Sequence, residues 1–264
     1  MYYIRERTLA GEFMAGTWCS LGSAIAAEIA GLAGYDWVLL DSEHAPSTAP
    51  GLMAQMQALS RFPTAPVVRI PWLDQVYVKW ALDMGASGIM VPYVETAEQA
   101  AAAVSCMRYS PQGIRGLGTA TRASDYGYDF PDYFSRANRE LLAVVQVETV
   151  RAVDNAAAIA AVDGVGVLFV GPMDLGNNGN MPGKFSDPRF MEMLRRVAAA
   201  ARGLGKACGI LLPDTNLVPA LRAIGYTFIA VGSDSGLLTR HFRENLAAMR
   251  SPLASAGAPA RNSA

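Results

Sequence analysis

The chain has 264 residues, of which 52% are hydrophobic and 17% are charged, and its formal net charge is −1. This apolar content allows a large core, in one barrel-sized domain or in two smaller domains. Because the charge is near zero and no basic blocks occur, nothing in the composition predicts binding to nucleic acid or to an anionic membrane.

The sequence shows no targeting or membrane segment. The first residues are charged and contain no apolar run, and no apolar stretch approaches the ~20 residues that span a bilayer. Three cysteines, Cys19, Cys106 and Cys208, are far apart and have no paired spacing. Such a distribution is typical of reduced core residues, so we expect a cytoplasmic protein.

Short apolar runs alternate with longer amphipathic segments along the whole chain. The runs predict eight strands, at 13–18, 36–40, 66–70, 88–91, 141–147, 165–170, 207–211 and 227–231. Helical spacing predicts a helix after each strand, at 23–33, 48–60, 74–84, 96–107, 150–160, 187–204, 215–224 and 234–249. Five of these helices begin with a predicted capping residue, namely Ser23, Thr48, Asp74, Thr96 and Thr215.

Eight strand–helix units in about 250 residues predict a (β/α)8 TIM barrel. We expect it to occupy residues 1–250 as one domain, followed by a disordered tail at 251–264 that is rich in Ala, Ser, Gly and Pro. A doubly wound open sheet is the alternative, but no Gly-x-Gly-x-x-Gly fingerprint follows an early strand. Two long connections, 110–138 and 176–186, are expected near the active site because long loops at strand ends are often functional.

Two carboxylates follow predicted strands at matching positions. Glu148 comes directly after the strand at 141–147, and Asp174 comes shortly after the strand at 165–170. Since neighbouring parallel strands end at the same edge of a sheet, the two acids are expected to converge there. A hard divalent cation would hold such a pair together. The spacing alone leaves an equal alternative, in which each acid caps the helix that follows it.

Other polar residues also stand at strand ends. His44 follows the second strand, where Asp41 could orient it for proton transfer, or it could simply hold the loop. Arg69 ends the third strand and suits a ligand that carries a carboxylate. Its structural alternative is an ion pair with Asp41 or Asp83, and we expect Glu43 to be a salt-bridge or loop residue.

The lysines argue against one rival mechanism. A Schiff-base aldolase needs a lysine inside the barrel, usually at the end of a strand. Lys79 falls in a predicted helix, and Lys206 precedes the seventh strand at the opposite rim. Lys184, in the connection after the sixth strand, is the one weak candidate. The sequence therefore favours a metal-dependent route.

In their order and spacing, these residues and motifs resemble the HpcH/HpaI class II aldolases, metal-dependent pyruvate aldolases that include 4-hydroxy-2-oxoheptanedioate aldolase. The resemblance extends from about Gly16 to Met249. Its carriers are Ala27-Glu28-Ile29, Gly34-Tyr35-Asp36-Trp37, Asp41-Ser42-Glu43-His44-Ala45-Pro46, Val68-Arg69-Ile70-Pro71, Leu82-Asp83-Met84-Gly85, Val91-Pro92, Arg108-Tyr109-Ser110-Pro111, Gly113-Ile114-Arg115-Gly116, Gln146-Val147-Glu148-Thr149 and Gly171-Pro172-Met173-Asp174-Leu175.

The resemblance implies a metal and a 2-oxo acid site. Glu148 and Asp174 are implied to be the two protein ligands of Mg²⁺, Mn²⁺ or Co²⁺, with the other coordination positions left to water and the 2-oxo acid. Arg69 and Gln146 would contact the oxo acid, and the backbone amides of Met173 and Asp174 would receive its carboxylate. On this reading the enzyme is a lyase that cleaves a 4-hydroxy-2-oxo acid to pyruvate and an aldehyde through a metal-bound enolate.

The resemblance also implies roles around that centre. His44, oriented by Asp41, would transfer a proton through a metal-bound water, and Asp83 would support the Arg69 region, partly across a subunit contact. Arg122 and Leu212 would border the aldehyde. Family members are typically homohexamers whose last helix packs on a neighbouring subunit. The resemblance also implies a role in the catabolism of aromatic compounds.

Two stretches depart from the family pattern. Gly166 stands where members commonly carry aspartate, on the rim away from the metal, so we expect an effect on stability at most. The turn at 176–180 lacks the usual serine, which leaves the substrate range open. Oxaloacetate decarboxylation and citryl-CoA cleavage are alternative reactions, although no basic cluster suits CoA, and a non-catalytic barrel is the third alternative.

Overall fold

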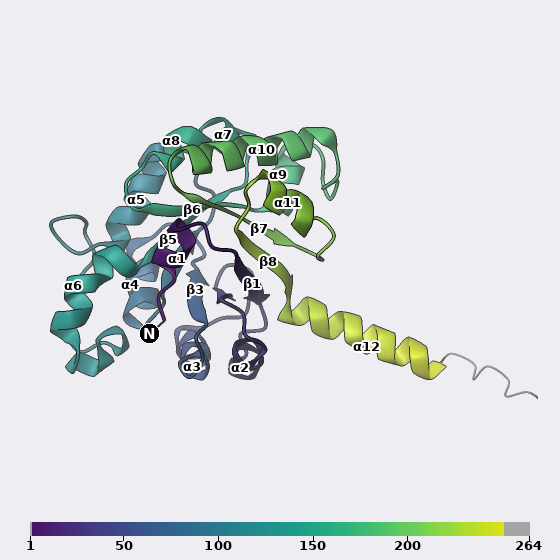
Figure 1. The fold of residues 1–264 in the computed structure, drawn as a ribbon. Helices are drawn as coiled ribbons and strands as arrows, with labels where there is room; N and C mark the ends of the chain where they lie inside the picture. The colour runs from purple at the N-terminus through teal and green to yellow at the C-terminus, as the bar shows by residue number, and fades with distance from the viewer. Residues whose placement is uncertain (1, 251–264) are drawn as a thin grey trace, which may run out of the picture.

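The computed structural model describes residues 2–250, and the predicted tail lies outside these residues. Eight parallel strands form one closed barrel in the order β1 to β8 (Figure 1). They are β1 Met14–Cys19, β2 Trp37–Asp41, β3 Ala65–Arg69, β4 Gly88–Val91, β5 Leu142–Val147, β6 Val165–Val170, β7 Ala207–Leu212 and β8 Phe228–Ser233. The predicted (β/α)8 barrel is confirmed, and all eight predicted strands exist within two residues of the expected positions.

Helices alternate with the strands and surround the barrel. They are α1 Arg5–Leu9, α2 Ala24–Ala33, α3 Ala49–Leu59, α4 Gln75–Asp83, α5 Ala97–Met107, η1 Arg122–Gly127, α6 Phe130–Glu140, α7 Val150–Asp154, α8 Ala156–Ala160, α9 Pro172–Asn178, α10 Pro188–Gly203, α11 Val218–Ile224 and α12 Asp234–Arg250. None of the helices within residues 2–250 combines the length and hydropathy needed to cross a bilayer.

Side-chain caps explain where several helices begin. Ser23, Thr48, Asp74 and Thr96 each accept a backbone N–H from the first turn of the helix that follows, as predicted. The predicted cap at Thr215 is wrong, because α11 begins after Leu217 and has no side-chain cap. The predicted helix at 150–160 is two short helices, because the backbone leaves helical geometry at Asn155.

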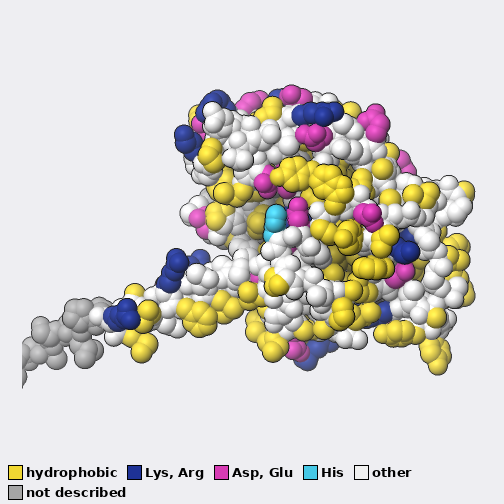
Figure 2. All heavy atoms as spheres, turned by 180° about the vertical axis from the view of Figure 1, so that it is seen from behind, with side chains coloured by type: hydrophobic (Ala, Val, Ile, Leu, Met, Phe, Trp, Pro, Cys, Tyr) yellow, Lys and Arg dark blue, Asp and Glu magenta, His cyan; other side chains and the backbone are white. Residues whose placement is uncertain are grey.

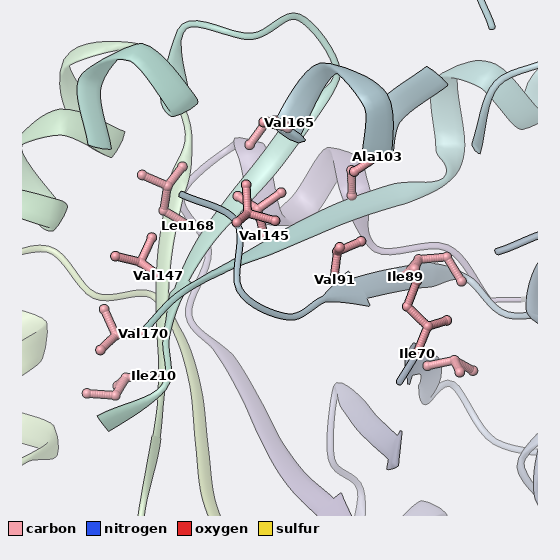
Figure 3. Packing of buried hydrophobic residues seen from close by; sticks show 14 of the residues in the cluster. Ile70, Ile89, Val91, Ala103, Val145, Val147, Val165, Leu168, Val170 and Ile210 are labelled. Carbon is pink, nitrogen blue, oxygen red and sulfur yellow. The ribbon is translucent and has the colours of Figure 1, made fainter. Parts of the chain in front are cut away.

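Two apolar layers hold the barrel together. The inner layer fills the barrel with aromatic and aliphatic side chains, and in it Trp37 stacks on Phe228 with ring centroids 4.0 Å apart. The outer layer consists mostly of aliphatic side chains between the strands and the helices, as Figure 3 shows for Val145, Leu168 and their neighbours. Since both faces of the sheet are covered, the strands are apolar throughout, which is why the sequence shows runs instead of alternation.

Helix α12 is different from the other barrel helices. Its first residue, Asp234, accepts hydrogen bonds from the backbone N–H and the hydroxyl of Ser20 at the end of β1. Beyond that anchor the helix leaves the barrel and projects from it (Figure 1), and none of its residues is buried.

The long connection at 110–138 does not lie where it was predicted. It follows helix α5 and leads into β5, so it belongs to the rim at which strands begin, not to the rim at which they end. It also contains η1 and most of α6 instead of a loop alone. The connection predicted at 176–186 begins inside α9, which extends to Asn178.

Candidate active site

The carboxyl ends of four strands bring the candidate residues together. Asp41 and Arg69 are partners in the register of β2 and β3, and both end their strands. In the same way β5 delivers Gln146 and, one residue after its end, Glu148. Asp174 stands in the first turn of α9, directly after β6. Because all strands run parallel, these residues share one rim.

Arg69 is fixed by acidic partners. Its Nε and Nη2 donate to the two carboxylate oxygens of Asp41 at 2.9 and 2.6 Å, and its Nη1 lies 3.0 Å from Oε2 of Glu43. The guanidinium also lies over the ring of Trp18, 5.3 Å from its centroid. Burial opposes ionisation of Asp41, but the hydrogen bonds and charge of Arg69 outweigh it and hold the pKa of Asp41 below its usual value.

Glu148 is a buried carboxylate with two neutral donors. Gln146 Nε2 donates to Oε1 at 2.7 Å, and the backbone N–H of Tyr93 donates to Oε2 at 3.0 Å. Burial raises the pKa of Glu148 to about 7, the Tyr93 N–H opposes that rise, and the charges of Asp174 and Glu43 add to it. Such a carboxylate is destabilised as an anion and would gain from a nearby cation.

Asp174 accepts a hydrogen bond from the hydroxyl of Tyr93, with 3.3 Å between the oxygens. No arginine, lysine or histidine within residues 2–250 forms a salt bridge with Asp174 or Glu148. The capping alternative for these acids does not hold, because Thr149 caps α7 and Gly171 precedes α9 without a side-chain cap.

A cavity of about 500 Å³ opens over these groups. Arg69, Gln146, Glu148, Met173, Asp174 and Leu212 all line it, so six predicted site residues lie together. Oε1 of Gln146 is buried there and has no hydrogen-bond partner among residues 2–250. A buried carbonyl oxygen without a partner is costly, so it indicates a group that a ligand or water satisfies.

The donor set fits a hard divalent cation. Two carboxylates without a basic partner and the unpartnered amide oxygen of Gln146 are oxygen groups of the kind that Mg²⁺ and Mn²⁺ prefer. Gly171 packs so closely that an added Cβ would lie 2.5 Å from Oε1 of Glu148. Residues 2–250 form no group of three or more His, Cys, Asp and Glu side chains suited to a metal. A cation held here would therefore keep positions for water and substrate oxygens, as Mg²⁺ commonly does.

The predicted contact between Asp41 and the His44 ring is not present. The Asp41 carboxylate binds Arg69 and accepts backbone N–H groups from Glu43 and His44, because the fork of an arginine matches both carboxylate oxygens. The imidazole of His44 is exposed, and its Nε2 lies 3.9 Å from Oε2 of Glu43. Glu43 is a salt-bridge residue, as predicted, and it joins Arg69 to His44.

Asp83 and Arg122 lie away from this cavity. Asp83 ends α4 and binds Arg115 at 2.8 Å, so its predicted contact with the Arg69 region is not made within the chain. Arg122 donates to the carbonyl oxygens of Met84 and Met56, near the ends of α4 and α3. Helices end at the rim opposite the carboxylates, so Arg122 does not border the cavity of its own chain.

Sequence reasoning missed three residues of the cavity region. Tyr93 comes two residues after the strand at 88–91, and Trp18 ends the predicted strand at 13–18, so their places at or after strand ends could have identified them. Arg240 lines the cavity from α12. Its helical position gave no signal, because the direction of α12 cannot be read from periodicity.

Gly166, the first departure from the family pattern, lies in β6 at the register shift opposite Ala143 and Val144. An added Cβ would lie 2.5 Å from the side chain of Leu142. Its place near the start of β6 separates it from the carboxylate rim.

The closed parallel barrel and the oxygen-rich cavity at the carboxyl ends of its strands define a TIM-barrel protein with the layout of barrel enzymes. Residues 14–240 match the model of the HpcH/HpaI aldolase/citrate lyase family, and the chain belongs to this family.

Individual relatives support the same assignment. A 5-keto-4-deoxy-D-glucarate aldolase of Salmonella arizonae is 42% identical over 86% of this chain and 89% of its own. The crystal structure of an HpcH/HpaI aldolase/citrate lyase family protein from Burkholderia cenocepacia is 39% identical with a TM-score of 0.89, and covers 94% of this chain and 99% of its own. An HpcH/HpaI aldolase from Desulfitobacterium hafniense is 26% identical with a TM-score of 0.90, over 96% and 98% of the two chains.

Proposed function

We propose that this protein is a divalent-metal-dependent carbon–carbon lyase that cleaves 4-hydroxy-2-oxo acids to pyruvate and an aldehyde. The observation that carries the proposal is the pair Glu148 and Asp174, which lines the same cavity as Arg69 and forms no salt bridge with a basic side chain of residues 2–250. In that cavity a cation would be held by the two carboxylates, and a 2-oxo acid would meet Arg69 and Gln146.

The chemistry follows from where charge develops. Breaking the bond between C3 and C4 of such an acid leaves negative charge on the pyruvate enolate. A divalent cation bound by Glu148 and Asp174 would stabilise that charge. Arg69 lies beside this place with its orientation fixed by Asp41 and Glu43, so it adds positive charge without first having to reorganise.

Proton transfer is assigned to the groups after β2. The hydroxyl on C4 must lose its proton as the aldehyde forms, and an imidazole is suited to accept it near neutral pH. We assign that step to His44, with Glu43 as the carboxylate nearest its ring. Asp41 does not contact the His44 ring. It accepts hydrogen bonds from Arg69 and from the backbone N–H of His44, and so positions both residues.

The relatives suggest the substrate. The name 5-keto-4-deoxy-D-glucarate, carried by the Salmonella aldolase, describes a dicarboxylate that reads as a 4-hydroxy-2-oxo acid when it is numbered from its other end. We propose it as one candidate and 4-hydroxy-2-oxoheptanedioate as the other. Both extend beyond C4, and Leu212, which lines the cavity, would border that part of the substrate.

Pyruvate release from both acids tests the proposal. The native protein would be assayed with EDTA and with EDTA plus excess Mn²⁺, beside Glu148→Ala and a control, Glu192→Ala, on the exposed face of α10. We expect EDTA to abolish release, Mn²⁺ to restore it, and only Glu148→Ala to lack it. Activity that survives EDTA and is trapped by borohydride would contradict the proposal and point to Lys184. Decarboxylation of oxaloacetate without any cleavage would favour the alternative reaction.

We also propose that α12 packs on a second copy of the chain within a hexamer. Four apolar residues on α12 are exposed, namely Leu238, Phe242, Leu246 and Met249, and their spacing places them along one side of the helix. Figure 2 shows hydrophobic side chains along this projecting helix. On the barrel, α2 exposes Ile25, Ile29 and Leu32 at 61 to 72%. An apolar helix and an apolar surface that both face solvent are typical of an interface.

Light scattering after size-exclusion chromatography tests this assembly. We expect a hexamer for the native chain and smaller species for Phe242→Glu, because a charge would then enter the apolar contact. Ala247→Glu adds the same charge to the opposite side of the same helix, where residue 247 is also exposed, and should leave the hexamer intact. A monomeric native protein would contradict the proposal.

A further inference from the structure

Tyr93 has an unusual backbone conformation for an aromatic residue. Its φ is 51°, in the left-handed region that bulky side chains rarely occupy. Two backbone contacts hold it there: its own N–H donates to Oε2 of Glu148 at 3.0 Å, and the N–H of Val94 donates to the carbonyl of Gln146 at 3.1 Å. The left-handed turn after β4 is therefore tied to the end of β5, and it directs the Tyr93 amide at the first carboxylate of the site.

The side chain of Tyr93 reaches the second carboxylate. Its hydroxyl donates to Oδ1 of Asp174 across 3.3 Å, and the residue is 40% exposed. Glu148 follows β5 and Asp174 lies in α9, so Tyr93 contacts both acids from a third element, the connection between β4 and α5. Among residues 2–250 only Tyr93 forms a hydrogen bond to each of them.

Two neighbouring carboxylates need such support. Like charges repel, and neither acid has a basic side chain as a partner within the described residues. Without donors, both carboxylates would turn apart or toward water when no cation is bound. Tyr93 supplies a donor to each, while no group within residues 2–250 donates a hydrogen bond to Oδ2 of Asp174, so this oxygen is open to a ligand.

We propose that Tyr93 is a positioning residue that holds Glu148 and Asp174 in the arrangement that binds the divalent cation. The inference rests on the metal dependence proposed above. The strained backbone is consistent with it, since left-handed conformations of non-glycine residues cost stability and cluster at functional sites. A residue kept only for stability would not need that conformation.

Tyr93→Phe tests the hydroxyl alone. The ring and the amide contact with Glu148 remain, and only the hydrogen bond to Asp174 is lost. Mn²⁺ binding would be measured without any oxo acid, from the electron paramagnetic resonance signal of free Mn²⁺. We expect the Kd for Mn²⁺ to rise about tenfold, as is usual when a group that orients a ligand is removed. Tyr128→Phe, at a residue that is 96% exposed, is the matched control and should bind Mn²⁺ as the native protein does.

Tyr93→Gly tests whether Tyr93 positions the two carboxylates or only stabilises the fold. Glycine accepts a positive φ without strain and keeps the N–H that binds Glu148. We expect its Mn²⁺ affinity to match that of Tyr93→Phe, and its thermal unfolding temperature to be no lower than the native value. A structural role would instead lower the unfolding temperature of both variants and leave Mn²⁺ binding unchanged.

Kinetics supply a second readout. In Tyr93→Phe, the Mn²⁺ concentration that gives half-maximal pyruvate release should rise about tenfold, while kcat at saturating Mn²⁺ changes less than about threefold. Native-like Mn²⁺ affinity in Tyr93→Phe would overturn the inference and leave the proposed function standing. A native protein that binds no Mn²⁺ would overturn both.

Discussion

Two buried arginines in this protein have similar surroundings but lie at opposite rims of the barrel. Arg69 is 8% exposed, pairs with Asp41 and lies over Trp18. Arg115 is 4% exposed, pairs with Asp83 at 2.8 Å and lies 4.5 Å from the ring centroid of Tyr109. By partners alone the two cannot be told apart.

The difference lies in what else each arginine meets. A further contact of Arg115 is the hydroxyl of Tyr133 on α6, at 2.8 Å, so its neighbours join secondary-structure elements to one another. Arg69 instead lines a cavity that also contains Glu148 and Asp174, two acids without a basic partner. A buried ion pair by itself therefore does not mark a functional site, whereas unpaired charge beside it does.

We expect the largest effects when each of the two arginines is replaced by lysine. Lysine keeps the positive charge but loses the planar fork that matches a carboxylate. Arg69→Lys should lower kcat/KM for pyruvate release by about 100-fold or more, equivalent to about 3 kcal/mol of transition-state stabilisation. It should also lower the thermal unfolding temperature, because lysine cannot donate to both oxygens of the buried Asp41 carboxylate.

Arg115→Lys is the matched variant at the other rim. It should lower the free energy of unfolding in urea by about 2 kcal/mol, because the contacts with Asp83 and Tyr133 cannot both be kept, and leave the activity of the folded fraction near the native value. An equal loss of activity at both arginines would remove the distinction between the rims. It would also indicate that the Asp83 region reaches the site of a neighbouring copy.

A smaller effect is expected from Gly171→Ala, which tests how closely the carboxylate site is packed. The new Cβ would lie 2.5 Å from Oε1 of Glu148, so the carboxylate or the start of α9 must shift. We expect the Kd for Mn²⁺ to rise between about tenfold and 100-fold, measured by calorimetric titration. Gly203→Ala is the control, because nothing lies within 4 Å of its new methyl group. It should bind Mn²⁺ normally.

The raised pKa of Glu148 predicts how the stability of the metal-free protein depends on pH. Burial raises this pKa from 4.5 to about 7, so the folded chain holds a proton more tightly than the unfolded chain does. The resulting stabilisation is complete below the unfolded value and is lost as the pH rises through about 7. In EDTA, the free energy of unfolding should fall by about 2 kcal/mol between pH 5 and pH 8. Glu148→Gln should lose this decline, and a decline that persists would belong to another group.

The barrel could be predicted because each strand can be identified from its own short segment of sequence. Each strand is an apolar run with a polar residue at or after its end, and closure places those ends at one rim, so Glu148, Asp174 and Arg69 could be brought together from sequence alone. The metal that they are proposed to bind remains a prediction.

The remaining features depend on contacts between distant segments. The ion pair between Arg69 and Asp41 was one of the predicted alternatives and is confirmed, but nothing local indicates that Arg69 occupies both oxygens of Asp41, so that the His44 ring lies nearest Glu43. The placement of Arg122 depends on the direction of a connection that follows a helix instead of a strand. The positive φ of Tyr93 is imposed by β5 and not by its own sequence.

The smallest effect is expected at a third ion pair. This pair has the same short N–O distance as Arg69 and Asp41 but is exposed, so it tests the effect of burial at constant distance. Arg108 and Asp163 are only 2.6 Å apart, as close as Arg69 and Asp41, but the side chain of Asp163 is 88% exposed. The hydrogen bond and charge of Arg108 lower the pKa of Asp163, yet solvent screens such an exposed group. Asp163→Asn should therefore change the free energy of unfolding in urea by less than about 0.5 kcal/mol, and salt should reduce even that change. A loss as large as that of Arg115→Lys would mean that distance, and not burial, decides what an ion pair contributes in this barrel.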